Sequence, residues 1–167
     1  AIQSINIQSG IFCLMKDRFQ DIIWVGADGQ GIYMYFTDEF SIENVLLDVP
    51  EYRVNNPVRA LFLDHEQTLW IGTKGGGILR MMDFHPDRET LPQAERILAN
   101  NSALMDNSVY SFAPGRRNSL WIGTEDGLNY YSYLTRRIEE FPVIADGKKV
   151  KYVHSICETN DSTCLLY

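Results

Sequence analysis

Short apolar runs separated by polar, glycine-bearing turns recur along the chain. The run LWIGT occupies Leu69–Thr73 and occurs again at Leu120–Thr124, and a close variant, IWVGA, occupies Ile23–Ala27. Each copy is followed within a few residues by a turn that contains glycine and by a second apolar run. Apolar residues stand at consecutive positions of these runs, which is typical of strands covered on both faces of their sheet. The pattern therefore predicts a strand–turn–strand hairpin that is repeated three times.

The three copies recur at a nearly fixed interval. Trp24 and Trp70 are separated by 46 positions, and Trp70 and Trp121 are separated by 51. Self-similarity at a period of about 40 to 50 residues is typical of propellers and solenoids. The hairpins are therefore parts of a larger repeated unit.

An additional apolar segment opens each repeat. These segments begin at Ile11, Val58, Val109 and Val153. Their third position is always small, and it holds Cys13, Ala60, Ser111 and Ser155. Small residues that recur on one strand face indicate crowding, as where the innermost strands of a propeller converge on its axis. The fourth repeat has Leu165 at the position of the tryptophan.

Two further strands are predicted in each repeat. The expected third and fourth strands are Ile32–Phe36 and Ile42–Leu47, Ile78–Met82 and Glu95–Leu98, and Leu128–Tyr133 and Ile138–Val143. Polar links join the repeats at Pro50–Pro57, Asn100–Ser108 and Ala145–Lys151, as turn chemistry requires. The stretch Leu91–Asn100 has helical character, but it is short and equally compatible with an edge strand.

Four antiparallel strands in a repeat of this length describe a β-propeller blade. The sequence predicts an all-β fold, a partial β-propeller of about three and a half four-stranded antiparallel blades. The expected repeats span approximately residues 11–48, 58–99 and 109–143, with a partial blade at 153–167.

Composition narrows the classes of partner. The chain has 167 residues, 45% of them hydrophobic, and its net charge of −7 leaves no basic face for nucleic acid. It contains no run of about 18 apolar residues and no signal-peptide pattern at its first residues, so nothing in it is expected to span a membrane. Cys13, Cys157 and Cys164 are an odd number without C-x-x-C spacing, which supports neither a zinc site nor a disulfide framework. We expect them to be small core residues.

The repeats resemble a known family. Asp64, the run at Leu69–Thr73 and the turn at Gly76–Ile78 are similar to the two-component regulator propeller repeat, which runs roughly D-x-x-G-x-L-W-I-G-T and then G-G-L. The third copy matches nearly as well through Gly127–Tyr131. The chain departs from the pattern at Gln67 and Asn118, which stand where the family has glycine, and in the fourth repeat.

The resemblance implies the periplasmic sensor region of a bacterial hybrid two-component protein, anchored in the inner membrane through its parent chain. In such proteins the propellers precede a membrane span, a histidine kinase and often a response regulator, and members are associated with sensing glycan-derived oligosaccharides. The kinase and receiver motifs are absent from these 167 residues, so signalling chemistry is expected elsewhere in the parent chain. The alternative is a stand-alone propeller that acts as a carbohydrate-active enzyme or as a protein-binding scaffold.

In a propeller, the turns between second and third strands share one end of the molecule with the links between blades. We expect a ligand-binding face there because loops on rigid scaffolds carry function. Its candidate residues are Asp28, Gln30, Arg53, Asn55, Asn56, Lys74, Asn100, Asn101, Asn107, Glu125, Asp126, Lys148 and Lys149. The repeated Trp24, Gly26, Trp70, Gly72, Trp121 and Gly123 are instead expected to form the structural core between blades.

No constellation for catalysis can be assembled. His65, His85 and His154 fall at unrelated places in the repeat, and no serine lies in a G-x-S-x-G context. The spacing from Asp64 to Trp70 is faintly similar to the Asp-box of sialidases, but that motif has an intervening glycine. We therefore expect no catalytic residue, no cofactor and no metal ion in this chain.

An incomplete ring leaves strands without neighbours at both ends. Such edges are templates for pairing with another chain. We expect the open blade edges to be covered either by a second copy, with two copies completing a ring of about seven blades, or by the rest of the propeller in the parent chain.

Overall fold

The computed structural model describes residues 4–45, 50, 53–85, 92–159 and 163–167. Within these ranges the chain forms antiparallel β-sheets and contains no α-helix. The first sheet has the order β1-β2-β3-β4, and its strands are Ile11–Lys16, Ile22–Ala27, Ile32–Phe36 and Ser41–Asn44. The second has the order β5-β6-β7-β8, with strands Val58–Leu63, Leu69–Thr73, Ile78–Met82 and Gln93–Ile97.

The third sheet repeats this plan. Its strands β9, β10, β11 and β12 are Val109–Gly115, Ser119–Thr124, Gly127–Ser132 and Arg137–Phe141. A small pair, β13 (Ile144–Ala145) and β14 (Lys148–Lys149), follows. The last pair, β15 (Ile156–Glu158) and β16 (Cys164–Leu166), is the beginning of a fourth blade.

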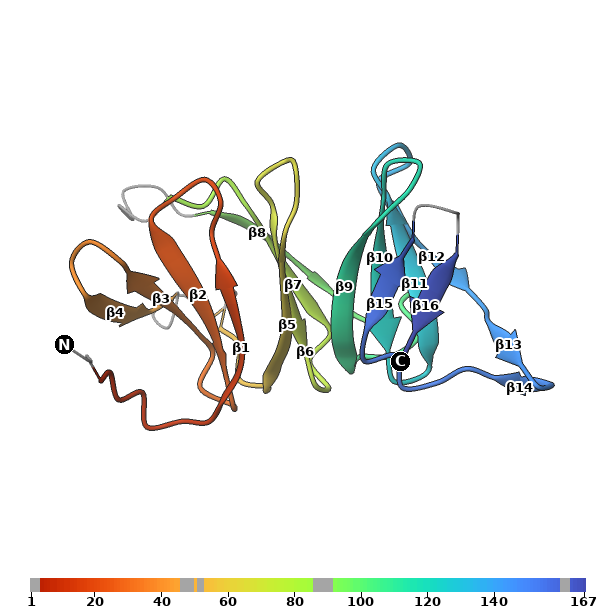
Figure 1. Cartoon of the computed structure of the whole chain (residues 1–167), viewed down its shortest axis with the longest axis horizontal. Helices are drawn as coiled ribbons and strands as arrows, with labels where there is room; N and C mark the ends of the chain where they lie inside the picture. The colour runs from red at the N-terminus through yellow and green to blue at the C-terminus, as the bar shows by residue number, and fades with distance from the viewer. Residues whose placement is uncertain (1–3, 46–49, 51–52, 86–91, 160–162) are drawn as a thin grey trace.

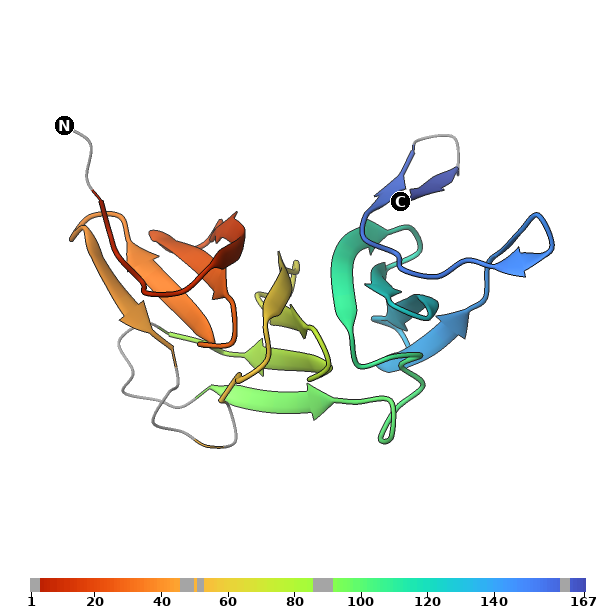
Figure 2. The same cartoon turned by 90° about the horizontal axis from the view of Figure 1, so that it is seen from below.

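The sheets stand side by side in Figure 1 and follow an arc in Figure 2. Figure 2 shows β1, β5, β9 and β15 on the inner, concave side of this arc and β4, β8 and β12 on its outer side. The expectation of an all-β partial propeller is confirmed. The hairpin β13–β14, by contrast, lies in a link that we expected to be an irregular turn.

The LWIG run packs two neighbouring blades at once because its side chains alternate between the faces of the sheet. Leu69 and Ile71 point back to the first blade, where they share a core cluster with Trp24. Trp70 points forward and shares a second cluster with Leu120 of the third blade. Each blade interface therefore joins the tryptophan of one blade to the Leu-x-Ile face of the next.

Glycine in this run allows the close approach of the inner strands. Gly72 pairs with Ala60 across the β5–β6 ladder, and a Cβ atom at Gly72 would lie 2.9 Å from Cγ1 of Val109 in the next blade. Gly26 has the same relationship to Cys13 and Val58. The small third residue of each inner strand and the glycine beside it therefore leave space for the β-branched residue that opens the following blade.

The observed strand ends differ slightly from those predicted. The fourth strands end at Asn44, Ile97 and Phe141, earlier than expected, and residues 46–49 of the first prediction lie outside the described residues. The stretch with helical character forms the edge strand β8, although Leu91 itself is not described. Among the described residues, no helix is long and apolar enough to cross a membrane.

Candidate ligand-binding site

Turns and links from successive blades lie along one edge of the row of blades, the lower edge in Figure 1. The amide of Lys74 donates to the carbonyl of Pro57 at 2.9 Å, and the amide of Glu125 donates to the carbonyl of Ser108 at 3.0 Å. These bonds tie the turn after the second strand to the link that precedes the same blade. We call this end the turn-and-link face, and the predicted binding residues lie in its turns and links.

Three asparagines among them have structural partners. The Asn56 amide donates to the carbonyl of Lys74 at 3.1 Å. The side-chain oxygen of Asn107 accepts from the amide of Ala99 at 2.8 Å, and its backbone carbonyl accepts from the amides of Gly75 and Gly77, at 3.1 and 2.8 Å. Asn101 bonds the backbone at the end of β8, through Leu98 N–H and the Arg96 carbonyl. These side chains therefore shape the loops.

Asp126 is held by two lysines. The Nζ atoms of Lys149 and Lys151 each lie 2.8 Å from its carboxylate oxygens. Hydrogen bonds from Lys149 and then Lys151 are the main reasons that the pKa of Asp126 lies below its ordinary value. Of the remaining candidates, Glu125 is partly buried, and the others are side chains exposed at the turns and links, namely Asp28, Gln30, Arg53, Asn55, Lys74, Asn100 and Lys148.

A β-bulge occurs at the same place in all three inner strands. The register of β1 against β2 shifts between Ile11 and Cys13, which leaves Phe12 as the extra residue. The same shift leaves Arg59 extra in β5 and Tyr110 extra in β9. A bulge re-aims the side chain of its extra residue.

The fourth inner segment has the corresponding geometry at His154. The amides of His154 and Ser155 both donate to the carbonyl of Tyr167, at 2.6 and 2.9 Å. Two residues therefore oppose one, as at a bulge. We call Phe12, Arg59, Tyr110 and His154 the bulge row.

Neighbouring members of the bulge row contact one another. The guanidinium carbon of Arg59 lies 4.0 Å from the ring centroid of Phe12, within cation–π distance. The rings of Tyr110 and His154 are stacked with centroids 4.5 Å apart. The Tyr110 hydroxyl donates to Glu125 Oε2 at 2.9 Å, which joins the row to the turn-and-link face. Burial, followed by this bond to Glu125, raises the pKa of Tyr110, while the positive charge of Arg59 acts in the opposite direction.

Sequence reasoning missed the bulge row. Its signal is present in the sequence as the second position of each inner segment, where a ring or a guanidinium precedes a small residue four times. Only strand pairing shows that this position is extra in the ladder.

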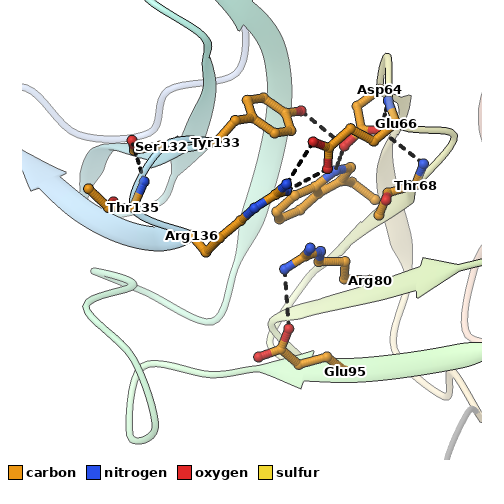
Figure 3. A network of polar contacts seen from close by, with 10 residues as sticks. Asp64, Glu66, Thr68, Arg80, Glu95, Ser132, Tyr133, Thr135 and Arg136 are labelled. Atoms are coloured by element: carbon orange, nitrogen blue, oxygen red, sulfur yellow. Dashed lines mark hydrogen bonds and ion pairs between the residues drawn. The ribbon is translucent and has the colours of Figure 1, made fainter.

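The opposite end of the first and second hairpins is closed by a buried aspartate. Asp64 accepts from the amides of Glu66 and Thr68, both at 2.9 Å, and from the indole N–H of Trp70 at 2.9 Å. Tyr133 of the third blade donates its hydroxyl to the same carboxylate at 3.0 Å (Figure 3). Asp64 is therefore an anchor for backbone and side-chain donors, as Asp17 is for Trp24 in the first blade.

Arginines strengthen the joint between the second and third blades. Arg136 forms hydrogen bonds to both carboxylate oxygens of Glu66, and this contact lowers the pKa of Glu66 (Figure 3). Arg80 lies over the rings of Trp70 and Tyr131, at 5.0 and 5.1 Å from their centroids. The network binds blade to blade.

The third tryptophan is less enclosed than the first two. Trp24 and Trp70 are 1% and 0% exposed, whereas Trp121 is half-buried and lines a hollow of about 470 Å³ together with Tyr130 and Phe141. Its indole N–H donates to Glu158 of the fourth blade at 2.9 Å, because the third hairpin lacks the aspartate of the other two.

The first blade also leaves open the face of its sheet that points away from the second blade. A hollow of about 260 Å³ is lined by apolar side chains and one tyrosine, and it includes Leu14, which is 64% exposed, and Ile23. Ile23 and Val25 occupy the positions that Leu69 and Ile71 hold in the second blade, where they pack on a preceding tryptophan.

Within the described part of the chain, no group of three or more His, Cys, Asp or Glu is arranged to hold a metal ion. Cys13, Cys157 and Cys164 are free thiols, and Cys157 is exposed, contrary to the expectation of a core residue.

Comparison with known proteins finds similarity to one family over part of the chain. The model of the two component regulator propeller matches residues 53–75 and 103–126. The chain is 27% identical over 161 residues to the histidine kinase P4 of Formosa agariphila, and this similarity covers 94% of the chain and 11% of that protein. The chain thus spans about a ninth of the length of this curated relative.

Solved structures share the fold. The extracellular domain of a hybrid two component system from B. thetaiotaomicron superposes with a TM-score of 0.66 at 16% identity, over 99% of this chain and 27% of that one. PorZ, a surface component of the type-IX secretion system of Porphyromonas gingivalis, gives 0.67 at 13% identity, over 93% and 24%.

Proposed function

The chain carries two-component regulator propeller repeats, and from this premise we propose that it is part of the ligand-sensing propeller of a hybrid two-component protein. The parent chain supplies the membrane span and the histidine kinase, and the propeller lies outside the cytoplasm, in the periplasm. The ligands are oligosaccharides released from glycans. This part of the chain senses and does not catalyse.

The turn-and-link face is the observation that supports this role best. Hydrogen bonds between turns and links hold polar loops from successive blades in one fixed surface, and loops on a rigid scaffold are the usual place of recognition. At the other end, the carboxylate of Asp64 is occupied by four donors. It is therefore not available as a catalytic acid or base.

Thermal unfolding of the ectodomain that contains this chain tests the proposal. A panel of neutral and acidic glycan oligosaccharides is added, and a ligand at 100 times its Kd stabilises the folded state by about 2.7 kcal/mol. Lys74→Glu, on the turn-and-link face, is expected to reduce the rise in Tm. Lys16→Glu, on the opposite hairpin end, is the matched control. The proposal fails if no oligosaccharide raises Tm, or if both variants respond alike.

Closure of the ring is part of the same proposal. The open face of the first blade offers the Ile23/Val25 half of a blade interface, and at the third blade the hairpin β15–β16 packs with Trp121 but leaves an open hollow beside it. The same two kinds of face meet between the first and second blades and between the second and third. Further propeller blades therefore cover both, either from a second copy or from the remainder of the parent chain.

Light scattering separates the two sources. A dimer of the isolated chain that is dissociated by Leu14→Glu identifies the second copy. If the isolated chain is a monomer and Leu14 is buried in the longer ectodomain, the rest of the parent chain covers this face. Exposure of Leu14 in both proteins contradicts ring closure.

A further inference from the structure

The four inner strands carry their extra residues at one level of the arc. Phe12, Arg59 and Tyr110 occupy the bulges of β1, β5 and β9, and His154 immediately precedes β15. Because these strands line the concave side (Figure 2), the bulge row runs along that side from blade to blade. Bulges are conserved structural devices that re-aim side chains beside functional sites, and here one recurs in every blade.

Arg59 is the chemically unusual member of the row. It is half-buried, and within the described residues its guanidinium forms neither a hydrogen bond nor an ion pair. Its Nε atom is buried there without an acceptor. This occurs in a chain with seven more acidic than basic groups, where Arg80, Arg116 and Arg136 all have carboxylate partners. A guanidinium fixed over Phe12 with donors to spare is suited to an external carboxylate.

The aromatic members of the row define the rest of the ligand. Phe12 is 42% exposed, and Tyr110 and His154 form a second aromatic surface farther along the row. The C–H face of a pyranose ring is apolar and suits the negative face of an aromatic ring. The negative charges of Glu125 and Asp106 make the electrostatic potential at Tyr110 more negative, and both raise the pKa of its phenol. A carboxylate is therefore favoured at the Phe12–Arg59 side of the row and disfavoured at the Tyr110 side.

From this arrangement we infer that the bulge row binds a carboxylated sugar, as in a uronate-containing oligosaccharide. The carboxylate pairs with Arg59, and the sugar rings stack on Phe12 and on Tyr110. This inference rests on the proposed sensor function and names the class of its ligand.

Isothermal titration calorimetry with digalacturonate and trigalacturonate, against the matched neutral galacto-oligosaccharides, tests the inference on the folded chain and on the longer ectodomain. The acidic sugars are expected to bind at least ten times more tightly than the neutral ones, and less tightly as salt rises. Arg59→Gln is expected to remove this preference, and Arg59→Lys to restore part of it. Phe12→Ala is expected to weaken both kinds of sugar. The control is Arg137→Gln, an exposed arginine on the outer strand β12, which is expected to change nothing.

The outcomes separate this inference from the proposed function. Preference for neutral sugars, or acidic-sugar binding that survives Arg59→Gln, overturns the carboxylate site and leaves the oligosaccharide sensor standing. Absence of binding to any saccharide by folded protein, verified by circular dichroism, contradicts both. Equal loss in Arg137→Gln shows a general charge effect and also overturns the site.

Discussion

Tyr133 in the third blade donates its hydroxyl to the buried carboxylate of Asp64 in the second blade, across 69 positions of sequence and 3.0 Å. The same carboxylate fixes the Trp70 indole at 2.9 Å. One aspartate therefore closes its own hairpin and anchors the neighbouring blade.

Removal of this hydroxyl is expected to loosen the joint. Tyr133→Phe leaves the Asp64 carboxylate buried with one donor fewer, at a cost of about 1 to 2 kcal/mol in the free energy of unfolding. Urea denaturation at neutral pH measures this loss. Tyr152→Phe, at an exposed tyrosine, is the matched control and is expected to be neutral. Equal stability of the two variants would show that the bond contributes nothing.

The same pair predicts a pH dependence. Burial first, and then the negative charge of Asp64, raise the pKa of Tyr133 in the folded protein. The stability from the neutral phenol is therefore complete below the unfolded-state pKa of about 10 and is lost as pH rises above it. Tyr133→Phe is expected to flatten the decline in stability above this pH. A parallel decline in wild type and variant would contradict the assignment.

Replacement of Gly72, the glycine of the LWIG run, by alanine is expected to destabilise the folded protein. Gly72→Ala places a Cβ atom 2.9 Å from Cγ1 of Val109 and 3.1 Å from Cε2 of Phe112, so neighbouring blades must move apart. We expect a loss of about 1 to 3 kcal/mol. Gly10→Ala is the control, because its nearest atom would be Asp28 Cβ at 3.7 Å. Thermal unfolding compares the two, and a stable Gly72→Ala protein would show that the blades can separate freely.

The three thiols are expected to differ in reactivity. Burial raises the pKa of Cys13 from 9.0 to about 11, and burial also raises the pKa of Cys164, whereas Cys157 is exposed. Since the thiolate is the nucleophile, iodoacetamide at pH 8 is expected to modify Cys157 first. Peptide mass spectrometry follows each site, and Cys157→Ser should remove the fast phase. Early modification of Cys13 would mean that the first blade opens readily.

Trp121 is expected to be the tryptophan most accessible to solvent. Trp24 and Trp70 are enclosed, whereas Trp121 lines an open hollow. Acrylamide quenching of fluorescence is therefore expected to fall sharply in Trp121→Phe and little in Trp70→Phe, provided that both variants fold. Binding of a further blade at this face should protect Trp121. Strong quenching that persists in Trp121→Phe would show that the inner blade interfaces are open.

Much of the fold follows from local pattern. Consecutive apolar residues and glycine turns are visible in each copy of the repeat, and a period near 50 residues is visible when the copies are compared. Alternation along a strand decides that Leu69 and Trp70 face different blades. The hairpins, the arc of blades and the position of the loops could therefore be predicted.

The candidate site was harder to predict because it depends on pairing and on neighbours. Asn56, Asn101 and Asn107 look like free polar loop residues in the sequence, yet each bonds a backbone that is remote from it or folded back on it. Glu158 replaces the missing hairpin aspartate for Trp121 from 37 positions away, which no local pattern shows.

The sequence by itself determined the repeat, the strand order within each blade and the family that the repeats resemble, since these depend on residue type and spacing. Only the tertiary structure decided which residues stand at the bulges, because an extra residue is defined by its ladder partner and not by its own identity. It also decided that Arg59 is half-buried over the Phe12 ring without a carboxylate partner in the described chain. Burial and partnership are properties of the assembled blades.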